Sequence, residues 1–414
     1  MFKDKLTADQ RERAAEILGA GPICDECLGR AFAKVGHGMG NAARGEALRE
    51  TATASPAAED PRACWVCGGL FAEVTAWAER AVAAAEGVVF DTYLFGVRLS
   101  TRVTTMQSLF EERFPTGTFE PLRHAFNREV GKAFEARVGH GTVDFDAPHL
   151  QFTVDLHANV LGFRILPVYI LGRYRKLLRG IPQTRWPCRR CRGRGCEDCD
   201  FTGKQYAESI EELIAAPFVE AAAAAGAHLH GAGREDIDAR MLGTGRPFVL
   251  ELTGPCIRRL DLPELEARVN VSASEKVGVS GLRVTGRRTV ALLKETPAEK
   301  TYRAIVEFDD DVTSESFENA VTSLVGEVRQ RTPRRVAHRR ADLVRGRRLL
   351  EASAVLCDAR HGELTLRTEG GLYVKELVSG DEGRTVPSLA SRLGVPARIT
   401  ALDVTDVHAG AFPI

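Results

Sequence analysis

A candidate nucleophilic carboxylate lies between two arginines in residues 233–243, which read Gly-Arg-Glu-Asp-Ile-Asp-Ala-Arg-Met-Leu-Gly. The segment leads into the apolar run 247–252, which predicts a buried strand that could hold reactive side chains in place. An ionised Asp236 could attack an electrophilic carbon or stabilise developing positive charge. Arg234 and Arg240 could keep that carboxylate charged or bind phosphates. On these residues alone, a solvated loop with an aspartate–arginine ion pair is the simpler interpretation.

Eight of the ten cysteines form four Cys-x-x-Cys pairs, which predict two structural zinc sites. This spacing lets both sulfurs of a pair reach one tetrahedral ion at about 2.3 Å, and a closed four-thiolate site leaves no open coordination position. A single pair could be a redox motif. The first residues do not read as a signal peptide, so disulfides are the less favoured interpretation. The expected grouping is Cys24, Cys27, Cys64 and Cys67 in one site, and Cys188, Cys191, Cys196 and Cys199 in the other.

Two arginine-rich runs predict a surface that binds phosphates. The chain has 56 basic and 56 acidic residues, so its formal net charge is zero. Residues 173–194 nevertheless contain nine Lys or Arg and no acid, and residues 329–348 contain nine arginines with Asp342 as the only acid. One such run is usually a solvated face, whereas two in an otherwise balanced chain favour a nucleic-acid ligand.

The length and composition indicate a globular protein with more than one domain. A chain of 414 residues favours two or three domains, and a hydrophobic content of 44% is ordinary for a globular protein. No apolar run approaches the roughly 18 residues needed to cross a bilayer. The sequence therefore predicts a cytoplasmic protein with no membrane contact.

Hydrophobic periodicity predicts a small mixed α/β domain in the N-terminal half. Apolar residues at helical spacing predict one helix that ends near Gly87 and a second that starts at Thr118 and buries four residues, Leu122, Phe126, Val130 and Phe134. Strands are expected at 88–99, 150–156 and 160–170. The Gly-rich residues 36–60, between the first two cysteine pairs, predict a mobile loop.

The C-terminal half predicts a larger, mainly antiparallel α+β domain. Its expected strands are 246–252, 281–293, 302–309, 335–343, 347–358, 363–369 and 397–407. Its expected helices are 206–226, 313–329 and 387–393.

Three segments of this domain together resemble the catalytic motifs of pseudouridine synthases, in particular those of archaeal tRNA pseudouridine synthases of the Pus-ten class. They are residues 233–242, residues 300–304 (Lys-Thr-Tyr-Arg-Ala), and residues 376–389 (Glu-Leu-Val-Ser-Gly-Asp-Glu-Gly-Arg-Thr-Val-Pro-Ser-Leu). The resemblance covers nearly the whole chain, because it extends to the cysteine pairs from Cys188 and to residues 24–30, 182–186, 202–204 and 330–336.

The resemblance implies a cofactor-free isomerisation of uridine to pseudouridine in the TΨC arm of tRNA, at tRNA positions 54 and 55. It implies no organic cofactor and no obligate protein partner. It also implies a THUMP-like RNA-binding region ahead of the catalytic domain. The expected domains are a four-cysteine zinc segment at 1–72, a THUMP-like domain at 73–180, a zinc knuckle at 181–204 and a pseudouridine synthase domain at 205–414.

Residue by residue, the resemblance assigns catalytic roles to Asp236, Tyr302 and Arg384. Asp236 matches the family's essential aspartate, which could attack C6 of the base or C1′ of the ribose, or stabilise charge on the ribose. Asp238 is the nearest rival carboxylate. Tyr302 would lie on a uracil swung out of its stack, and its hydroxyl could relay a proton; a core tyrosine is the alternative. Arg384 would pair with Asp236 and keep it ionised.

The flipped nucleotide also needs cations that hold the flanking phosphates, because swinging a base out of its stack costs a few kcal/mol. Lys300 is interpreted as a phosphate contact or a surface lysine. The candidate substrate-binding residues are Arg234, Arg240, Lys300, Arg331, Arg334 and Arg335.

Two other functions compete with this prediction. A non-catalytic zinc protein that binds structured RNA would explain the cysteines and arginines, but it gives no reason for Asp236, Tyr302 and Arg384 as a set. An RNA methyltransferase or thiolation enzyme with a THUMP-type region would need a phosphate-cradling loop before a helix. The nearest candidate, residues 243–247, leads into a strand.

Overall fold

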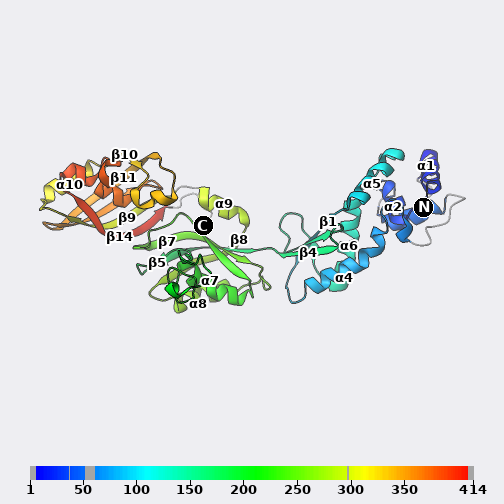
Figure 1. Cartoon of the computed structure of the whole chain (residues 1–414), viewed down its shortest axis with the longest axis horizontal. Helices are drawn as coiled ribbons and strands as arrows, with labels where there is room; N and C mark the ends of the chain where they lie inside the picture. The colour runs from blue at the N-terminus through cyan, green and yellow to red at the C-terminus, as the bar shows by residue number, and fades with distance from the viewer. Residues whose placement is uncertain (1–5, 37, 52–60, 296–297, 409–414) are drawn as a thin grey trace. The chain divides into compact units, whose positions relative to one another are not determined.

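The chain divides at Pro167 into two units, residues 1–166 and residues 167–414 (Figure 1). The structure is a computed structural model that describes residues 6–36, 38–51, 61–295 and 298–408. The predicted strand 160–170 is two strands, because Pro167 has no backbone N–H to continue the ladder. The second of these strands, β5 (Val168–Lys176), pairs within the later unit. The expected domain boundary at residue 180 therefore differs from the observed division.

The first unit combines helices with a four-stranded sheet of order β2-β1-β3-β4. Its strands are β1 (Thr92–Arg98), β2 (Thr142–Val143), β3 (Leu150–Asp155) and β4 (Val160–Ile165). Its helices are α1 (Ala8–Gly19), α2 (Asp25–Ala31), α3 (Asn41–Arg49), η2 (Pro61–Ala63), η3 (Leu70–Glu73), α4 (Val74–Ala84), α5 (Thr101–Arg113) and α6 (Leu122–Val138).

The longest described helix, α6, confirms the predicted helical spacing. Leu122, Phe126, Val130 and Phe134 are fully buried, and Phe134 packs edge-on against Phe95 of β1. The alternation of β3 is also confirmed, because every second side chain from Leu150 is buried. No helix of the described residues is both long and apolar enough to span a membrane.

The second unit is built on a ten-stranded sheet, so the predicted α+β class is confirmed. Besides β5, its strands are β6 (Gly226–Gly231), β7 (Ala239–Thr253), β8 (Val277–Thr285), β9 (Glu299–Phe308), β10 (Gly326–Arg331), β11 (Val344–Asp358), β12 (His361–Thr368), β13 (Thr385–Val386) and β14 (Ala397–His408). Its helices are η4 (Glu197–Cys199), α7 (Ile210–Ala221), α8 (Leu262–Ser272), α9 (Arg287–Glu295), α10 (Ser314–Thr322), η5 (Arg334–Arg339), α11 (Val374–Ser379), η6 (Asp381–Gly383) and α12 (Leu389–Leu393).

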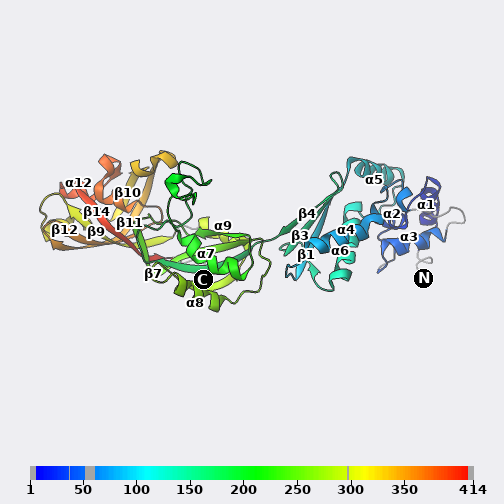
Figure 2. The same ribbon diagram turned by 60° about the horizontal axis from the view of Figure 1, so that its bottom comes forward.

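The strand order is β13-β10-β11-β12-β9-β14-β7-β5-β8, with β6 paired to β7. Figure 2 labels β7, β9 and β14 of this sheet. Every pairing is antiparallel except β14 with β7, which joins two half-sheets at a parallel seam. Each half has its own hydrophobic core, and Tyr302 of β9 packs against both. On the β5–β8 side, α7 and α8 cover one face, while α9 covers the other through Leu293. The seam is therefore where both half-sheets meet.

Several predicted elements of the second unit are wrong in type. The predicted strand 281–293 ends at Thr285 and continues as α9, because Val290 and Leu293 pack at helical spacing. The predicted helix 313–329 stops at Thr322, and β10 follows with Val328 buried between exposed neighbours. The predicted strand 335–343 contains η5, which begins after Pro333 and makes no ladder.

The predicted mobile loop at 36–60 is also wrong in part. It contains α3, in which Arg44 is buried and donates hydrogen bonds to backbone carbonyls that include Val35 O at 2.8 Å. Gly29 of α2 lies so close to Asn41 of α3 that an added Cβ would be 1.8 Å from its carbonyl oxygen. These contacts hold α3 against α2. Residue 37 and residues 52–60 of this prediction lie outside the described residues.

Candidate active site

Asp236 lies on the loop between β6 and β7 and lines a cavity of about 560 Å³ in the second unit. The parallel seam forms one wall, through Ala239 of β7 and Leu402 and Val404 of β14. The Asp236 side chain is 31% exposed, so it is reachable from the cavity and partly shielded from bulk water. The remaining lining residues are Gly233, Arg234, Glu235, Arg246, Lys300, Tyr302, Arg335, Val336, Arg340, Gly371, Leu372, Tyr373, Val374 and Lys375.

A buried ion pair lies directly behind this loop. The Arg246 and Glu235 side chains are 1% and 0% exposed, and their Nε and Oε2 atoms are 2.9 Å apart. The buried Tyr174 hydroxyl donates to the same carboxylate at 2.8 Å. Burial raises the pKa of Tyr174 well above its usual value, so the phenol keeps the proton it donates. Removing either ion-pair partner would leave a buried charge without compensation.

Side chains from outside the loop also fix its backbone carbonyls. Arg246 Nη1 donates to Ala232 O at 2.6 Å, and Gln183 Nε2 donates to Gly233 O at 3.1 Å. The buried Lys176 ammonium donates to the carbonyls of Asp236 and Ile237 at 3.3 and 2.7 Å. A backbone held at these points restricts where the Asp236 side chain can point, which a reactive group requires.

Two cations contact the Asp236 carboxylate. Arg335 Nη1 donates to Oδ1 at 3.0 Å, and the Lys375 Nζ lies 3.6 Å from Oδ2. Arg335 is also held by Glu376, with Nε 2.6 Å from Oε1. Burial alone would lower the pKa of Arg335, but the carboxylates of Glu376 and Asp236 raise it above its usual value. Both cations therefore place positive charge next to the Asp236 carboxylate.

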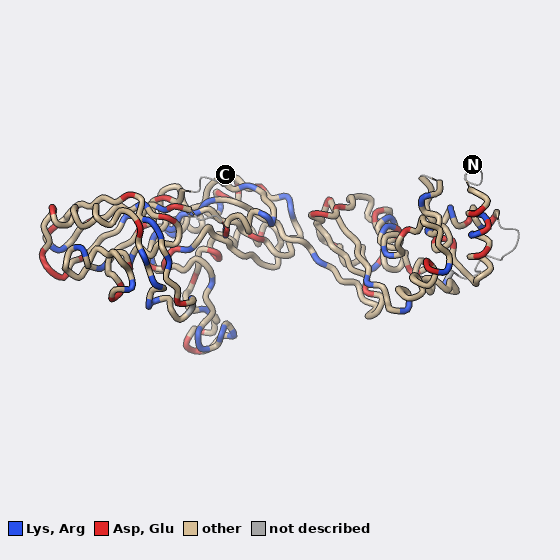
Figure 3. Tube along the Cα trace, turned by 90° about the horizontal axis from the view of Figure 1, so that it is seen from above, with Lys and Arg blue, Asp and Glu red and all other residues tan. Residues whose placement is uncertain are grey.

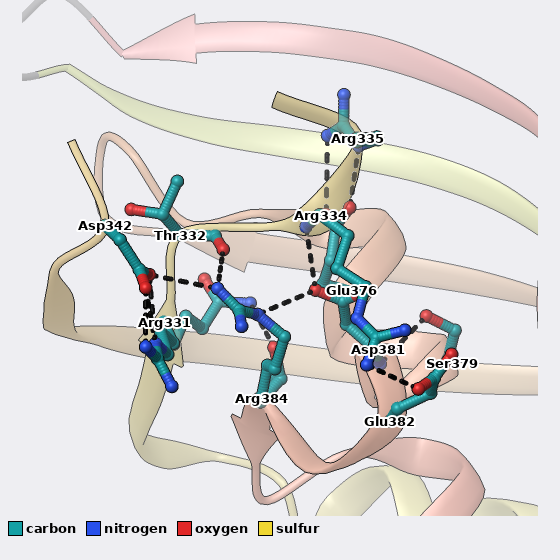
Figure 4. A network of polar contacts seen from close by, with 12 residues as sticks. Arg331, Thr332, Arg334, Arg335, Asp342, Glu376, Ser379, Asp381, Glu382 and Arg384 are labelled. Atoms are coloured by element: carbon teal, nitrogen blue, oxygen red, sulfur yellow. Dashed lines mark hydrogen bonds and ion pairs between the residues drawn. The ribbon is translucent and has the colours of Figure 1, made fainter. Parts of the chain in front are cut away.

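Arg384 does not pair with Asp236, so that predicted contact is wrong. Its Nη2 donates to Thr332 O at 2.7 Å and to Asp342 Oδ1 at 3.0 Å, and its Nε lies 3.6 Å from Asp381 (Figure 4). Arg384 is not among the residues that line the cavity. Arg335, predicted to bind substrate, occupies the place expected for Arg384.

Arg384 instead holds the segment that carries Arg335. Its side chain binds Thr332 O and Asp342, which flank η5, and its own carbonyl accepts from Arg331 N at 2.8 Å. Both ends of the arginine-rich turn are thereby tied to the loop after α11. Arg384 therefore contacts the segment that carries Arg335 and not Asp236 itself.

Tyr302 and Lys300 line the cavity from the start of β9. Burial raises the pKa of Tyr302 to about 12, with Asp236 adding to the shift and Arg246 opposing it, so its hydroxyl is protonated at neutral pH. Burial and then the nearby Arg246 charge lower the pKa of Lys300 to about 8. The Lys300 ammonium donates to Ala298 O at 3.2 Å.

Of the other predicted substrate-binding arginines, only Arg234 lines the cavity. Its guanidinium lies over the Trp186 ring, 4.8 Å from the centroid. The other three form ion pairs outside the cavity: Arg240 with Asp403 at 2.6 Å, Arg331 with Asp342 at 2.5 Å and Arg334 with Glu382 at 2.6 Å. The rival carboxylate Asp238 is 68% exposed and pairs with Lys375 at 2.6 Å. It does not line the cavity.

The sequence interpretation missed five charged residues of the site, Glu235, Arg246, Arg340, Lys375 and Glu376. Lys375 and Glu376 lie in the first turn of α11, at the edge of a recognised motif. Glu376 comes close to Arg335 only because η5 lies beside that helix in the fold. Glu235 adjoins Asp236 in sequence, and Arg246 is its partner across the hairpin. The one local sequence signal for the Glu235–Arg246 pair is that Arg246 directly precedes the apolar run 247–252.

The eight paired cysteines come together in two groups of four with the predicted membership, so the predicted grouping is confirmed. In each group the four sulfurs lie within 4.8 Å of one another, close enough to bind one metal ion. The Cys24 and Cys67 sulfurs are 3.7 Å apart, and those of Cys188 and Cys196 are 3.9 Å apart. The first group is part of the hydrophobic core of the first unit, whereas the second forms a small separate core.

Comparison with known proteins places the whole chain in one family. The family model "Pus10, C-terminal" matches residues 169–408, and the model "Pus10 THUMP domain, archaeal" matches residues 77–155. Among solved structures, one titled "Crystal Structure of a Cbf5-Nop10-Gar1 Complex" aligns with 57% of this chain and 48% of its own at 16% identity, with a TM-score of 0.33. A match at that level adds nothing to the family assignment.

Curated relatives named "tRNA pseudouridine synthase Pus10" match nearly the full length. The relative from Halorubrum lacusprofundi is 46% identical, over 97% of this chain and 96% of its own. Those from Methanothrix thermoacetophila and Methanothermobacter marburgensis are 43% and 45% identical, over 97% and 96% of this chain and 95% and 99% of their own. The chain therefore belongs to the archaeal Pus10 family of tRNA pseudouridine synthases, which are isomerases that act on tRNA.

Proposed function

We propose that this enzyme converts uridine to pseudouridine at tRNA positions 54 and 55 of the TΨC arm, with Asp236 as the nucleophile acting on a flipped nucleotide. The observation that carries the proposal is the Asp236 carboxylate on a cavity wall, on a loop whose backbone is fixed from behind, with a protonated phenol in the same cavity. A uridine reaches such a cavity only when it leaves its stack.

The reaction breaks the bond between N1 of uracil and C1′ of ribose and forms a bond between C5 and C1′. The proton on C5 is lost and N1 gains one, so the product is an isomer of the substrate. Asp236 attacks the nucleotide as a carboxylate, which Arg335 and Lys375 contact at 3.0 and 3.6 Å. When substrate enters, these cations can turn to the phosphates while Asp236 takes up its role.

Tyr302 supplies a ring surface for the detached base. Its pKa is raised to about 12, so its hydroxyl donates a hydrogen bond at neutral pH and can relay a proton from that position. We propose that Arg234, Lys300 and Arg335 contact the nucleotide in the cavity, and that Arg240, Arg331 and Arg334 bind flanking phosphates outside it. Arg384 acts as a positioning residue through Thr332 and Asp342.

The Lys300 contact predicts a pH dependence of substrate binding. Because the pKa of Lys300 is lowered to about 8, its positive charge is present below that pH and is lost as the pH rises through it. We therefore expect the KM for tRNA to rise between about pH 7 and pH 9 in the wild type. In the Lys300→Met variant, the increase in KM that comes from deprotonation of Lys300 should be absent. Measuring KM across this range in both proteins tests the contact, and parallel profiles would contradict it.

We further propose that both cysteine groups bind structural Zn²⁺. Four thiolates within reach of one ion form the ligand set that tetrahedral zinc prefers. Elemental analysis of the purified chain should find close to two zinc ions, one for each group. A value near one would mean that one group binds no metal.

The two sites should differ in their effect on stability. Cys27 is fully buried in the core of the first unit, so Cys27→Ser should lower the melting temperature of that unit by more than about 10 °C. Cys188 belongs to a small separate core, so Cys188→Ser should remove one zinc and leave that transition in place. Scanning calorimetry with zinc analysis compares them, and equal shifts would contradict the assignment.

The substrate assignment is tested by mapping pseudouridine in an unmodified tRNA transcript incubated with the pure protein. We expect modification at positions 54 and 55 and at no other uridine. Transcripts with cytidine at one of the two positions show whether each uridine is modified independently. Modification elsewhere would contradict the proposed target while leaving the family assignment unchanged.

A further inference from the structure

An arm that contains the second cysteine group projects from the second unit. We name residues 187–204 the knuckle; a backbone bridge between Pro187 and Lys204 closes its base, and the second cysteine group lies inside it. Figure 3 shows this segment extending away from the sheet, with Lys and Arg positions along it. An arm stiffened by one metal ion can present side chains at a fixed distance from the body of the protein.

The knuckle is tightly folded and holds one aromatic side chain outward. Phe201 is 73% exposed and has a left-handed backbone, with φ of 57°, as do its neighbour Asp200 at 48° and Arg192 at 54°. A bulky residue in this conformation is strained, and Asn or Gly would make the same turn at lower cost. Burial does not offset the strain, because the ring faces solvent. The position therefore favours a functional role for the ring.

Four arginines lie on the surface of the knuckle, at positions 189, 190, 192 and 194. Arg190 pairs with Asp198 at 2.5 Å, and Arg194 Nε donates to Cys191 O at 3.2 Å. Arg189 and Arg192 form no ion pair or hydrogen bond through their side chains within the described part of the chain. These two guanidinium groups are available to an anionic ligand, since the knuckle does not use them.

The base of the knuckle borders the catalytic cavity. Trp186 precedes Pro187, its ring lies 5.7 Å from that of Tyr206, and it carries the Arg234 guanidinium 4.8 Å from its ring centroid. Arg234 itself lines the cavity that contains Asp236. The root of the knuckle is therefore joined to the cavity lining through Arg234.

We propose that the knuckle is an RNA-binding arm, in which Phe201 stacks on an unpaired base of the substrate tRNA while Arg189 and Arg192 bind the adjacent phosphates. The proposal rests on the proposed function. Aromatic rings at exposed positions stack on bases of any sequence, and hairpin loops offer such unpaired bases. The two unpaired arginines of the same knuckle favour a polyanion over an apolar protein partner.

The stacking is tested by binding measurements with the full-length chain. In an Asp236→Asn background, which stops turnover, Phe201→Ala should weaken the affinity for unmodified tRNA at least about fivefold. Alanine keeps the Cβ and the backbone strain, so only the ring is lost. Phe201→Trp should retain the affinity, and unchanged zinc content verifies the fold. If Phe201→Ala binds tRNA as tightly as the parent, the stacking is absent and the proposal fails.

The phosphate contacts have a separate signature. Replacing Arg189 and Arg192 together with alanine should reduce the slope of log Kd against log salt by about two, whereas Phe201→Ala should leave the slope unchanged. An unchanged slope in the double variant would overturn the phosphate assignment.

Photocrosslinking separates this proposal from the catalytic one. Transcripts carrying 4-thiouridine in the TΨC loop should crosslink to the knuckle peptide that contains Phe201, and this readout needs no turnover. A crosslink elsewhere only would overturn the knuckle assignment even if Asp236→Asn is inactive. A crosslink at Phe201 with an active Asp236→Asn enzyme would support the knuckle and reject only the proposed nucleophile.

Discussion

Asp236→Asn is expected to lower kcat by at least about 1,000-fold while the affinity for tRNA stays within a few-fold of the wild type. The substitution keeps the shape of the side chain and removes the charge that the proposed reaction requires. Arg335 retains its contacts with Glu376, at 2.6 and 3.3 Å, so the cation nearest Asp236 stays in place. Single-turnover pseudouridine formation and tRNA binding, measured on the same preparation, separate chemistry from recognition.

Asp238→Asn is the matched control for this experiment. Asp238 is two residues away, is 68% exposed and contacts Lys375 without lining the cavity. Its replacement should change kcat less than about tenfold, through a shift of Lys375 alone. If the two variants lose activity equally, or if Asp236→Asn remains fully active, Asp236 is not the nucleophile.

Arg246→Met is expected to destabilise the second unit by about 3–5 kcal/mol, the largest stability effect of any single substitution considered for the site. The change removes a guanidinium that is 1% exposed and leaves the fully buried Glu235 carboxylate without its partner. It also frees the carbonyl of Ala232, which Arg246 holds at 2.6 Å. Amide hydrogen exchange in β7 measures the free energy of opening for this unit without interference from the first.

A double-mutant cycle assigns the cause of this loss. Glu235→Gln combined with Arg246→Met removes both charges, so the double variant should be more stable than Arg246→Met alone. The turnover of the double variant should still be low, because the loop that carries Asp236 has lost its fixed backbone. A loss below about 1 kcal/mol for Arg246→Met would show that the buried pair does not hold the fold together.

The parts of the site that could be predicted from the sequence are those encoded by short contiguous runs. Asp236 and Tyr302 were found because each sits in a recognisable segment next to a strand, and both line the cavity. The cysteine grouping followed from spacing alone, because two residues between thiols suit one ion. Their catalytic roles stay predictions that the proposed variants test.

The pairing of Asp236 could not be predicted, because it depends on how distant elements fold together. Arg335 is 99 positions away along the chain and reaches Asp236 from η5, a turn that was expected to be a strand. With arginines at almost every second position in this region, composition does not distinguish the one that faces the cavity. Arg384 was chosen by motif position, yet its guanidinium is engaged by Thr332 and Asp342.

Errors in the fold have similar causes. Residues 290–293 read Val-Ala-Leu-Leu, an apolar run too short to distinguish a strand from a helix, and only the packing of Val290 and Leu293 against β6 and β7 selects a helix. The buried Arg44 and Lys176 are charged residues in the interior, and composition-based interpretation assigns such residues to the surface. In both cases tertiary contacts override the local signal.

The position of β14 in the sheet determines when the second unit can complete its cavity during protein synthesis. Residues 397–408 form the strand between β7 and β9, and they contribute Leu402 and Val404 to the cavity wall. β14 is synthesised after every other strand of this sheet. The two half-sheets therefore cannot pair through it until it has been synthesised. A nascent chain that still lacks these residues has no complete pocket for a nucleotide.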